Sequence, residues 1–296
     1  MSRDPSLALT EPPDPVEQRL RSVQFWEEAA PGWIARQELM RQFAGHVSHW
    51  LVDAIHPQPG ETVLELAAGL GETGLLAAEL VAPGGEAIIS DQARAMIEGA
   101  RTKAKELGIE NVRFEIFGAE WIDLPVASVD AVLCRFGYML VTDPLAALIE
   151  TRRVLRPNGR LALAVWDHIG ANPWAAEPSM ELTERGLAPP PADGSSFQPG
   201  PFALGDKEFL GELLEQAGFT DVRTDALALE RHHSNFGDFW DATLDMSRVF
   251  HDLVQERPER EITEIRQGVA GRLARFERKD GTLVVPGRAL VALASA

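Results

Sequence analysis

Short apolar runs alternate with amphipathic stretches along most of the chain. Residues 16–30 and 31–55 carry apolar side chains at spacings of three and four, which predicts two N-terminal helices. Strands are predicted at 62–67, 86–90, 112–117, 131–134 and 161–166, with helices between them. Because these strands are apolar at nearly every position, both faces of their sheet should be covered. The pattern predicts an α/β fold with a doubly wound, mostly parallel seven-stranded sheet.

The last third of the chain is expected to complete that sheet around an insertion. A helix at 207–217 and a strand at 222–229 come first, and 233–280 looks helical twice. Strand-like segments at 283–285 and 289–294 flank a Pro286-Gly287 break. We therefore predict a loose tail (1–15), N-terminal helices (16–57), a Rossmann-like core (58–232), a helical insertion or lid (233–280) and a final core strand (281–296).

Composition narrows the class of partner. The 296 residues include 28 basic and 45 acidic side chains, a net charge of −17 that opposes binding to nucleic acid or to an anionic membrane. The one cysteine, Cys134, cannot form an intrachain disulfide, and the acidic start lacks the pattern of a signal peptide. No apolar run approaches 18 residues. These features predict a soluble, cytoplasmic protein.

A glycine-rich loop follows the first predicted strand. Gly69, Gly71 and Gly74 match the G-x-G-x-x-G template in the required strand-turn-helix context. Asp91 ends the second strand, where that template expects an acid to bind ribose hydroxyls. The alternative is a purely structural role, with the glycines permitting a tight turn and Asp91 capping the next helix. A nucleoside-containing ligand is the interpretation that explains both features.

Glu65 bears on which nucleoside the loop would bind. Its charge, four residues before the first glycine, would repel a pyrophosphate by roughly 1 to 4 kcal/mol and would attract an ammonium or sulfonium group. S-adenosylmethionine carries both cations, a carboxylate for the loop amides, and a ribose for Asp91. An NAD(P)-dependent oxidoreductase remains the alternative, since it shares the glycine loop and the acid.

At this point the sequence resembles the class I S-adenosylmethionine-dependent methyltransferases, in particular their quinone-biosynthesis-like and small-molecule branch. The resemblance covers about residues 40–167 and rests on several ordered motifs: 63–71, 90–96, 117–120, 134–138 and 154–159. It implies a Rossmann-like fold and S-adenosyl-L-methionine as the cofactor. By this resemblance the methionine part would be bordered by Glu65, Leu66, Ala67, Gly69 and Gly71. Family members usually have glycine where Ala67 stands.

The same resemblance implies the remaining cofactor contacts. Asp91 would bind the ribose, with Gln92 and Met96 near the adenine. Gly118, Ala119 and Glu120 fall where the family often places an aspartate against the adenine amino group, although Gly118 replaces that acid. Arg135 and Phe136 complete the predicted site at the end of the fourth strand.

Candidates for chemistry on the acceptor are fewer. His168 follows the fifth strand and is our first candidate for a general base, with Tyr138 as a second contributor. Solvent exposure or packing is the alternative role for both, as it is for His232 and His233. We expect Cys134 to be structural, and the scattered histidines form no metal-ligand spacing, so no metal is predicted.

The acceptor is predicted only by class. Tryptophan, phenylalanine and methionine residues, among them Trp26, Trp33 and Met40, lie outside the predicted sheet. They either pack helices together or line an apolar pocket over the cofactor. We predict a methyltransferase for a small, apolar or aromatic molecule; because no base is assured, a non-catalytic S-adenosylmethionine-binding protein is a second alternative.

Overall fold

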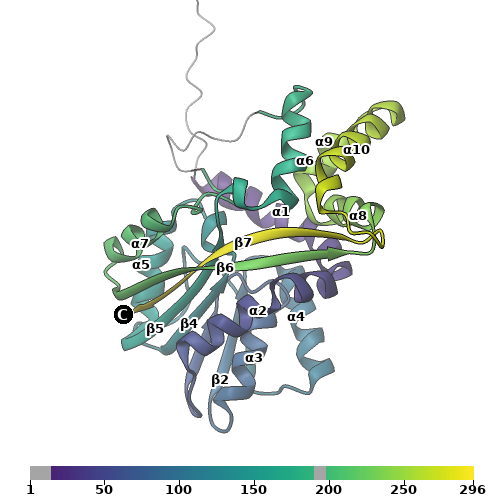
Figure 1. Cartoon of the computed structure of the whole chain (residues 1–296). Helices are drawn as coiled ribbons and strands as arrows, with labels where there is room; N and C mark the ends of the chain where they lie inside the picture. Colours follow the sequence, from purple (N-terminus) through teal and green to yellow (C-terminus); the bar gives the residue numbers. More distant parts are fainter. Residues whose placement is uncertain (1–14, 190–197) are drawn as a thin grey trace, which may run out of the picture.

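A computed structural model describes residues 15–189 and 198–296 of the chain, and one seven-stranded sheet organises them (Figure 1). The strand order is β3-β2-β1-β4-β5-β7-β6, and only β7 runs antiparallel to its neighbours. This confirms the predicted doubly wound, mostly parallel sheet. The strands are β1 (Thr62–Glu65), β2 (Glu86–Asp91), β3 (Val112–Ile116), β4 (Val129–Arg135), β5 (Leu155–Trp166), β6 (Thr220–His233) and β7 (Leu283–Ser295).

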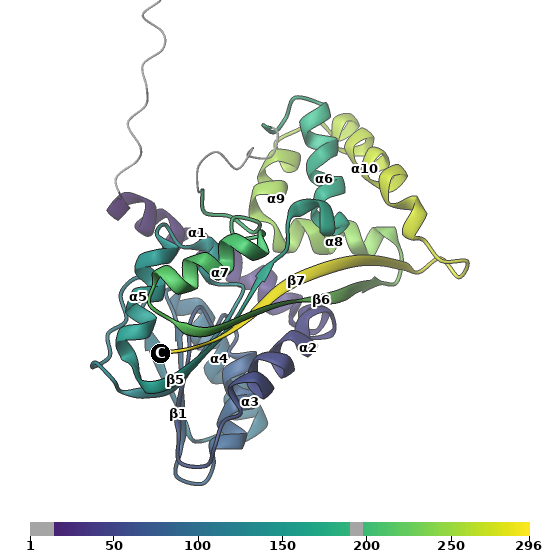
Figure 2. The ribbon, with the colours of Figure 1, turned by 60° about the vertical axis from the view of Figure 1, so that its left-hand side comes forward.

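Helices cover both faces of this sheet, as its apolar strands require (Figures 1 and 2). One face carries α2 (Gln37–Ile55), α3 (Glu72–Val81) and α4 (Arg94–Leu107), and the other carries α5 (Pro144–Val154) and α7 (Lys207–Gln216). The long helix α1 (Pro15–Ala35) packs against α4 and against α8 (Phe236–Met246). The largest apolar core lies between the sheet and these layers.

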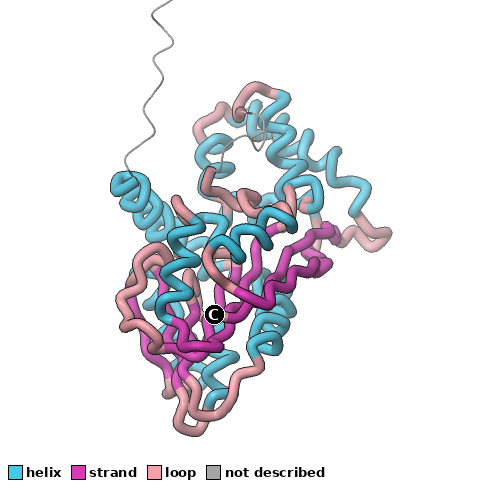
Figure 3. Tube along the Cα trace, turned by 90° about the vertical axis from the view of Figure 1, so that its left-hand side faces the viewer, coloured by secondary structure: helices cyan, strands magenta, loops and turns pink. Residues whose placement is uncertain are grey.

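A second group of helices lies beyond one end of the β6–β7 pair, as the tube in Figure 3 makes clear. It consists of α6 (Pro173–Glu184), α8 (Phe236–Met246), α9 (Arg248–Gln255) and α10 (Glu259–Leu273). Buried Phe239, Ile265 and Leu273 belong to its own core, which also takes in Leu283 and Val285 of β7. The group therefore has an apolar core distinct from that of the sheet.

The structure corrects the predicted insertion in three ways. β6 continues to His233, so the strand reaches into the segment assigned to the insertion. Three helices follow rather than two, because Ser247 caps a new helix by accepting a hydrogen bond from the Phe250 amide. Helix α6, which was not predicted, packs against α10 although many residues separate them. The division into domains itself stays a prediction.

Two predicted breaks are incorporated into strands. β7 runs without interruption through Pro286 and Gly287, since β5 pairs with β7 only from Ala289 onward and leaves one side of β7 open at Pro286. β5 includes the predicted Pro157-Asn158-Gly159 turn, which appears as a register shift against β4 with Asn158 at a φ of 65°. Both strands are consequently longer than predicted.

The N-terminal helices divide at Arg36, not at residue 30. Pro31 lies inside α1 and removes one backbone hydrogen bond, yet the helix continues to Ala35. Packing explains this: Gly32 lies directly against the Asp245 carbonyl of α8, so tertiary contact outweighs the local cost of the proline. The predicted tail lies outside the described residues up to residue 14, and part of the proline- and glycine-rich connection, 190–197, does as well.

Within 15–189 and 198–296, no helix combines the length and apolar character needed to cross a membrane.

Candidate active site

A cavity of about 980 Å³ opens at the carboxyl ends of β1, β2 and β4. Strand order reverses between β1 and β4, which is where open α/β sheets bind their ligands. The wall comes from the loops after these strands and from helices α1, α2, α3 and α4. Ten residues predicted to bind the cofactor line it: Ala67, Gly69, Asp91, Gln92, Met96, Gly118, Ala119, Glu120, Arg135 and Phe136.

Asp91 organises the glycine loop. Its Oδ2 accepts a hydrogen bond from the Gly69 amide at 2.8 Å, and its Oδ1 accepts one from the Ala93 amide at 2.9 Å. Burial raises the pKa of this carboxyl, because only 8% of the residue is exposed. The exposed part faces the cavity, so Asp91 can hold the loop and still accept hydrogen bonds from a ligand.

Glu65 does not line the cavity, which corrects the role that we predicted for its charge. The side chain is buried behind the loop, and its Oε2 accepts a hydrogen bond from the Gly74 amide at 2.8 Å. Burial raises its pKa from 4.5 to about 7, so the carboxyl is far from fully ionised at neutral pH. Its evident function is to hold the first turn of α3, and attraction of a cation cannot rest on direct contact.

Leu66 and Gly71 also lie off the cavity wall. Leu66 is wholly buried in the core below the loop. Gly71 has a φ of 76° and packs toward Ala100 and Ile89, where a side chain would be crowded. Ala67 does reach the cavity, but with a φ of 49° it adopts a backbone conformation that favours the glycine usual in the resembled family.

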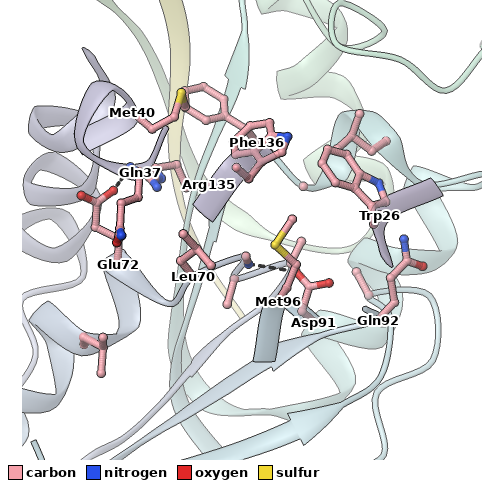
Figure 4. Close-up of a pocket in the computed structure, with 18 of the residues that line it drawn as sticks. Trp26, Gln37, Met40, Leu70, Glu72, Asp91, Gln92, Met96, Arg135 and Phe136 are labelled. Atoms are coloured by element: carbon pink, nitrogen blue, oxygen red, sulfur yellow. Dashed lines mark hydrogen bonds and ion pairs between the residues drawn. The ribbon is translucent and has the colours of Figure 1, made fainter. Parts of the chain in front are cut away.

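One end of the cavity lies under α1 (Figure 4). There Gln92 donates a hydrogen bond from Nε2 to the Ser22 hydroxyl at 2.8 Å, and Glu120 forms an ion pair with Arg19. The Glu27 carboxylate accepts hydrogen bonds from the Arg94 and Ala95 amides, which caps α4 from a distant helix. Helix α1 thus contacts the same loops that were predicted to bind adenine.

The rest of the cavity wall mixes apolar side chains with charged residues of α2, α3 and α4, among them Glu38, Arg41 and Lys103. Arg135 Nη1 lies 2.6 Å from Glu72 Oε2, and both side chains line the wall beside Gln37 (Figure 4). Met40 and Phe136 supply the adjoining apolar surface. The Glu72–Arg135 pair therefore places a negative carboxylate beside a positive guanidinium group. This arrangement suits a ligand group that carries one positive and one negative charge.

The two residues predicted to take part in catalysis, His168 and Tyr138, do not line the cavity. The side chain of Tyr138 is fully buried, and its hydroxyl lies 2.6 Å from the Thr151 hydroxyl of α5. His168 lies outside the wall, where its Nε2 is 3.3 Å from Arg288. Backbone direction explains these positions: each residue follows a strand end, but its side chain turns toward the core or toward β7.

The other histidines considered lie elsewhere. His232 and His233 border a separate depression beside Arg36 and Asp238. Cys134 is fully buried, and burial raises its thiol pKa to about 12, which makes it unreactive. The residues that the structure describes contain no group of three metal-ligating side chains.

Several wall residues were not assigned to the site from sequence. Gln37 and Glu72 were not predicted to line the site. For Trp26, Trp33 and Met40 the sequence allowed two roles, helix packing or an apolar pocket, and these residues do line the cavity. The available signal for Glu72 was its place inside the glycine loop motif. For the α1 and α2 residues no local signal existed, because which helix face meets the cavity depends on how the helices cross the sheet.

Substitution Glu65→Gln is expected to alter the pH dependence of stability. Between pH 4.5 and 7 the folded protein retains a proton on Glu65 that the unfolded chain has released, so this stabilising contribution is lost as the pH rises. At 1.36 kcal/mol per pKa unit the loss is about 3 kcal/mol. Urea unfolding should therefore show the variant gaining about that much relative to the wild type by pH 8. Exposed Glu106→Gln serves as control; equal profiles for the two variants would contradict the buried-carboxyl interpretation.

Comparison with known proteins adds sequence relatives to this geometry. Residues 57–217 match a family model described as a methyltransferase domain. An arsenite methyltransferase of Halobacterium salinarum is 32% identical over 190 residues, which are 64% of this chain and 44% of that protein. The ubiquinone/menaquinone biosynthesis C-methyltransferase UbiE of Pasteurella multocida is 37% identical over 111 residues, 37% of this chain and 41% of that protein. The matches thus span less than half the length of these relatives.

A solved structure is similar in fold. The crystal structure of the YcgJ protein of Bacillus subtilis superposes with a TM-score of 0.56 at 17% sequence identity, covering 85% of this chain and 98% of that one. At this identity the likeness concerns the arrangement of sheet and helices alone.

Proposed function

Since the chain belongs to the methyltransferase domain family, we propose that it transfers a methyl group from S-adenosylmethionine to a small-molecule acceptor. The observation that carries the proposal is the cavity at the β1–β4 switch point, with Asp91 both holding the glycine loop and facing inward. Family membership favours this cofactor over the dinucleotide of an NAD(P)-dependent oxidoreductase.

Different residues of the cavity suit different parts of this cofactor. Asp91 would accept hydrogen bonds from the ribose hydroxyls, and the adenine would lie near Gln92 and Met96. The amino acid end, which carries an ammonium and a carboxylate, fits the paired charges of Glu72 and Arg135. That pair takes the electrostatic role first assigned to Glu65.

The cofactor supplies an electrophilic methyl group on a positively charged sulfur. This chain's residues hold the reacting groups in line and exclude water, and such positioning can supply much of the rate. Met40 and Phe136 supply apolar surface beside the Glu72–Arg135 pair, and this surface would limit the access of water to a bound acceptor. A base is required only for an acceptor that must lose a proton, so the failure of His168 and Tyr138 to reach the cavity does not exclude transfer.

Arsenite is a poor acceptor candidate, although one relative carries that name. Trivalent arsenic is soft and prefers thiolate ligands. The sole cysteine of this sequence is Cys134, which is buried with its pKa raised to about 12. We therefore propose an organic acceptor. A cytoplasmic location is part of the same proposal, supported by the use of that cysteine as a free buried thiol.

Calorimetry with S-adenosylhomocysteine and NAD tests the cofactor. We expect S-adenosylhomocysteine to bind at least about tenfold more tightly, because NAD carries a pyrophosphate while Glu72 places a carboxylate at the loop. The reverse order would refute the assignment. A screen with methyl-labelled S-adenosylmethionine and a set of organic acceptors then separates an enzyme from a non-catalytic binding protein, since only the enzyme transfers label.

A further inference from the structure

Phe136 has a backbone conformation that its residue type disfavours. It follows the last residue of β4 with a φ of 62°, in the left-handed region where a bulky aromatic residue is an outlier. Its amide donates a hydrogen bond to the Ala164 carbonyl at 2.7 Å, which holds the backbone there. Strain of this kind persists only where surrounding structure enforces it, and it gathers at functional sites.

Other aromatic rings hold the ring of Phe136 in place. Trp166 stacks on it with centroids 3.9 Å apart and planes inclined by 10°, and Phe43 in turn stacks on Trp166 with centroids 5.4 Å apart. Trp174 meets the edge of Trp166 at 5.0 Å. Trp166 and Phe43 are themselves buried, so this stack of three rings cannot turn without disturbing the core.

Trp166 covers one face of Phe136, and among the described residues no other aromatic ring stacks on it. The residue is partly exposed and lines the cavity, beside Met40 and close to the Glu72–Arg135 pair (Figure 4). The rigid ring thus lies at the strand-order switch point, next to the end of the cavity proposed for the amino acid part of the cofactor.

We propose that the face of Phe136 turned away from Trp166 is the platform on which a planar aromatic acceptor stacks for methylation. The proposal rests on the proposed methyl transfer and narrows its substrate class. A planar ring gains offset stacking on a fixed partner beyond the burial of its area, whereas a saturated ring of equal size gains only the burial. A preformed surface also avoids the entropic cost of ordering a side chain on binding.

The test compares 2-naphthol with decahydro-2-naphthol, its saturated counterpart, by calorimetry on the protein loaded with S-adenosylhomocysteine. We expect the wild type to bind the aromatic probe about tenfold more tightly. Phe136→Tyr keeps the planar face and should keep the preference. Phe136→Leu keeps apolar bulk without the face and should reduce the preference to about twofold or less. Phe114→Leu makes the same change outside the cavity and should behave as the wild type.

Each other outcome counts against the proposal. Equal binding of the two probes by the wild type, binding of neither, or an unchanged preference in Phe136→Leu overturns it. If Phe136→Leu instead weakens S-adenosylmethionine more than S-adenosylhomocysteine, the ring serves the sulfonium by a cation–π contact and the acceptor platform is wrong. Absence of S-adenosylhomocysteine binding by the wild type would be a separate result, the failure of the proposed function itself.

Discussion

Asp91→Asn is expected to weaken S-adenosylhomocysteine binding by about 10- to 100-fold. Hydrogen bonds to a charged acceptor contribute about 1.5 to 3 kcal/mol, and the amide replaces one acceptor oxygen by a donor. That donor would face the amide of either Gly69 or Ala93, since each now donates to a different carboxylate oxygen. Loss of the ribose acceptor and a local shift of the glycine loop therefore both weaken the binding of S-adenosylhomocysteine.

Calorimetry of the variant checks this expectation, with thermal unfolding as a second readout. Glu106→Gln, an exposed change on α4, is the control and should leave affinity unaltered. Unchanged affinity in Asp91→Asn would remove Asp91 from the ribose site. If the melting temperature falls but the affinity of the folded protein does not, the carboxylate is structural only, which is the alternative that the sequence left open.

Gly32→Ala is expected to destabilise the protein by about 3 kcal/mol or more. A β-carbon at this position would lie 2.0 Å from the Asp245 carbonyl oxygen, so the backbones of α1 and α8 would have to separate. Arg36, at the end of α1, forms ion pairs with Asp238 and Asp245 and would be displaced with them. Because α1 covers one end of the cavity, binding of S-adenosylhomocysteine should weaken as well.

The matched control is Gly211→Ala in α7, where an added methyl group meets no atom within 4 Å. That change should stabilise by about 0.5 to 1 kcal/mol, since alanine is the better helix former. Thermal unfolding of both variants decides the matter: a fall of about 5 to 10 °C is expected for Gly32→Ala and a small rise for Gly211→Ala. Equal behaviour would mean that the crossing of α1 and α8 is looser than the structure indicates.

The sequence alone predicted the sheet correctly, and most of the residues that it predicts for the cofactor line one cavity. Periodicity located the first five strands within a few residues, because an apolar strand between two helical layers has a local signature. The glycine loop and Asp91 were likewise found from spacing, since both positions are set by one strand and the turn after it. The sequence therefore determined those features, the strands and the glycine loop, whose structure depends on a short segment of the chain alone.

Tertiary structure decided the rest. Glu65 is near the loop in sequence but points below it, Tyr138 turns into the core, and Glu72 and Arg135 meet only because β4 lies beside β1. The contact of α1 with α8 and the three-ring stack behind Phe136 join residues far apart in the chain. Side-chain direction and long-range contact depend on how elements pack together, and no local pattern of residues carries that information.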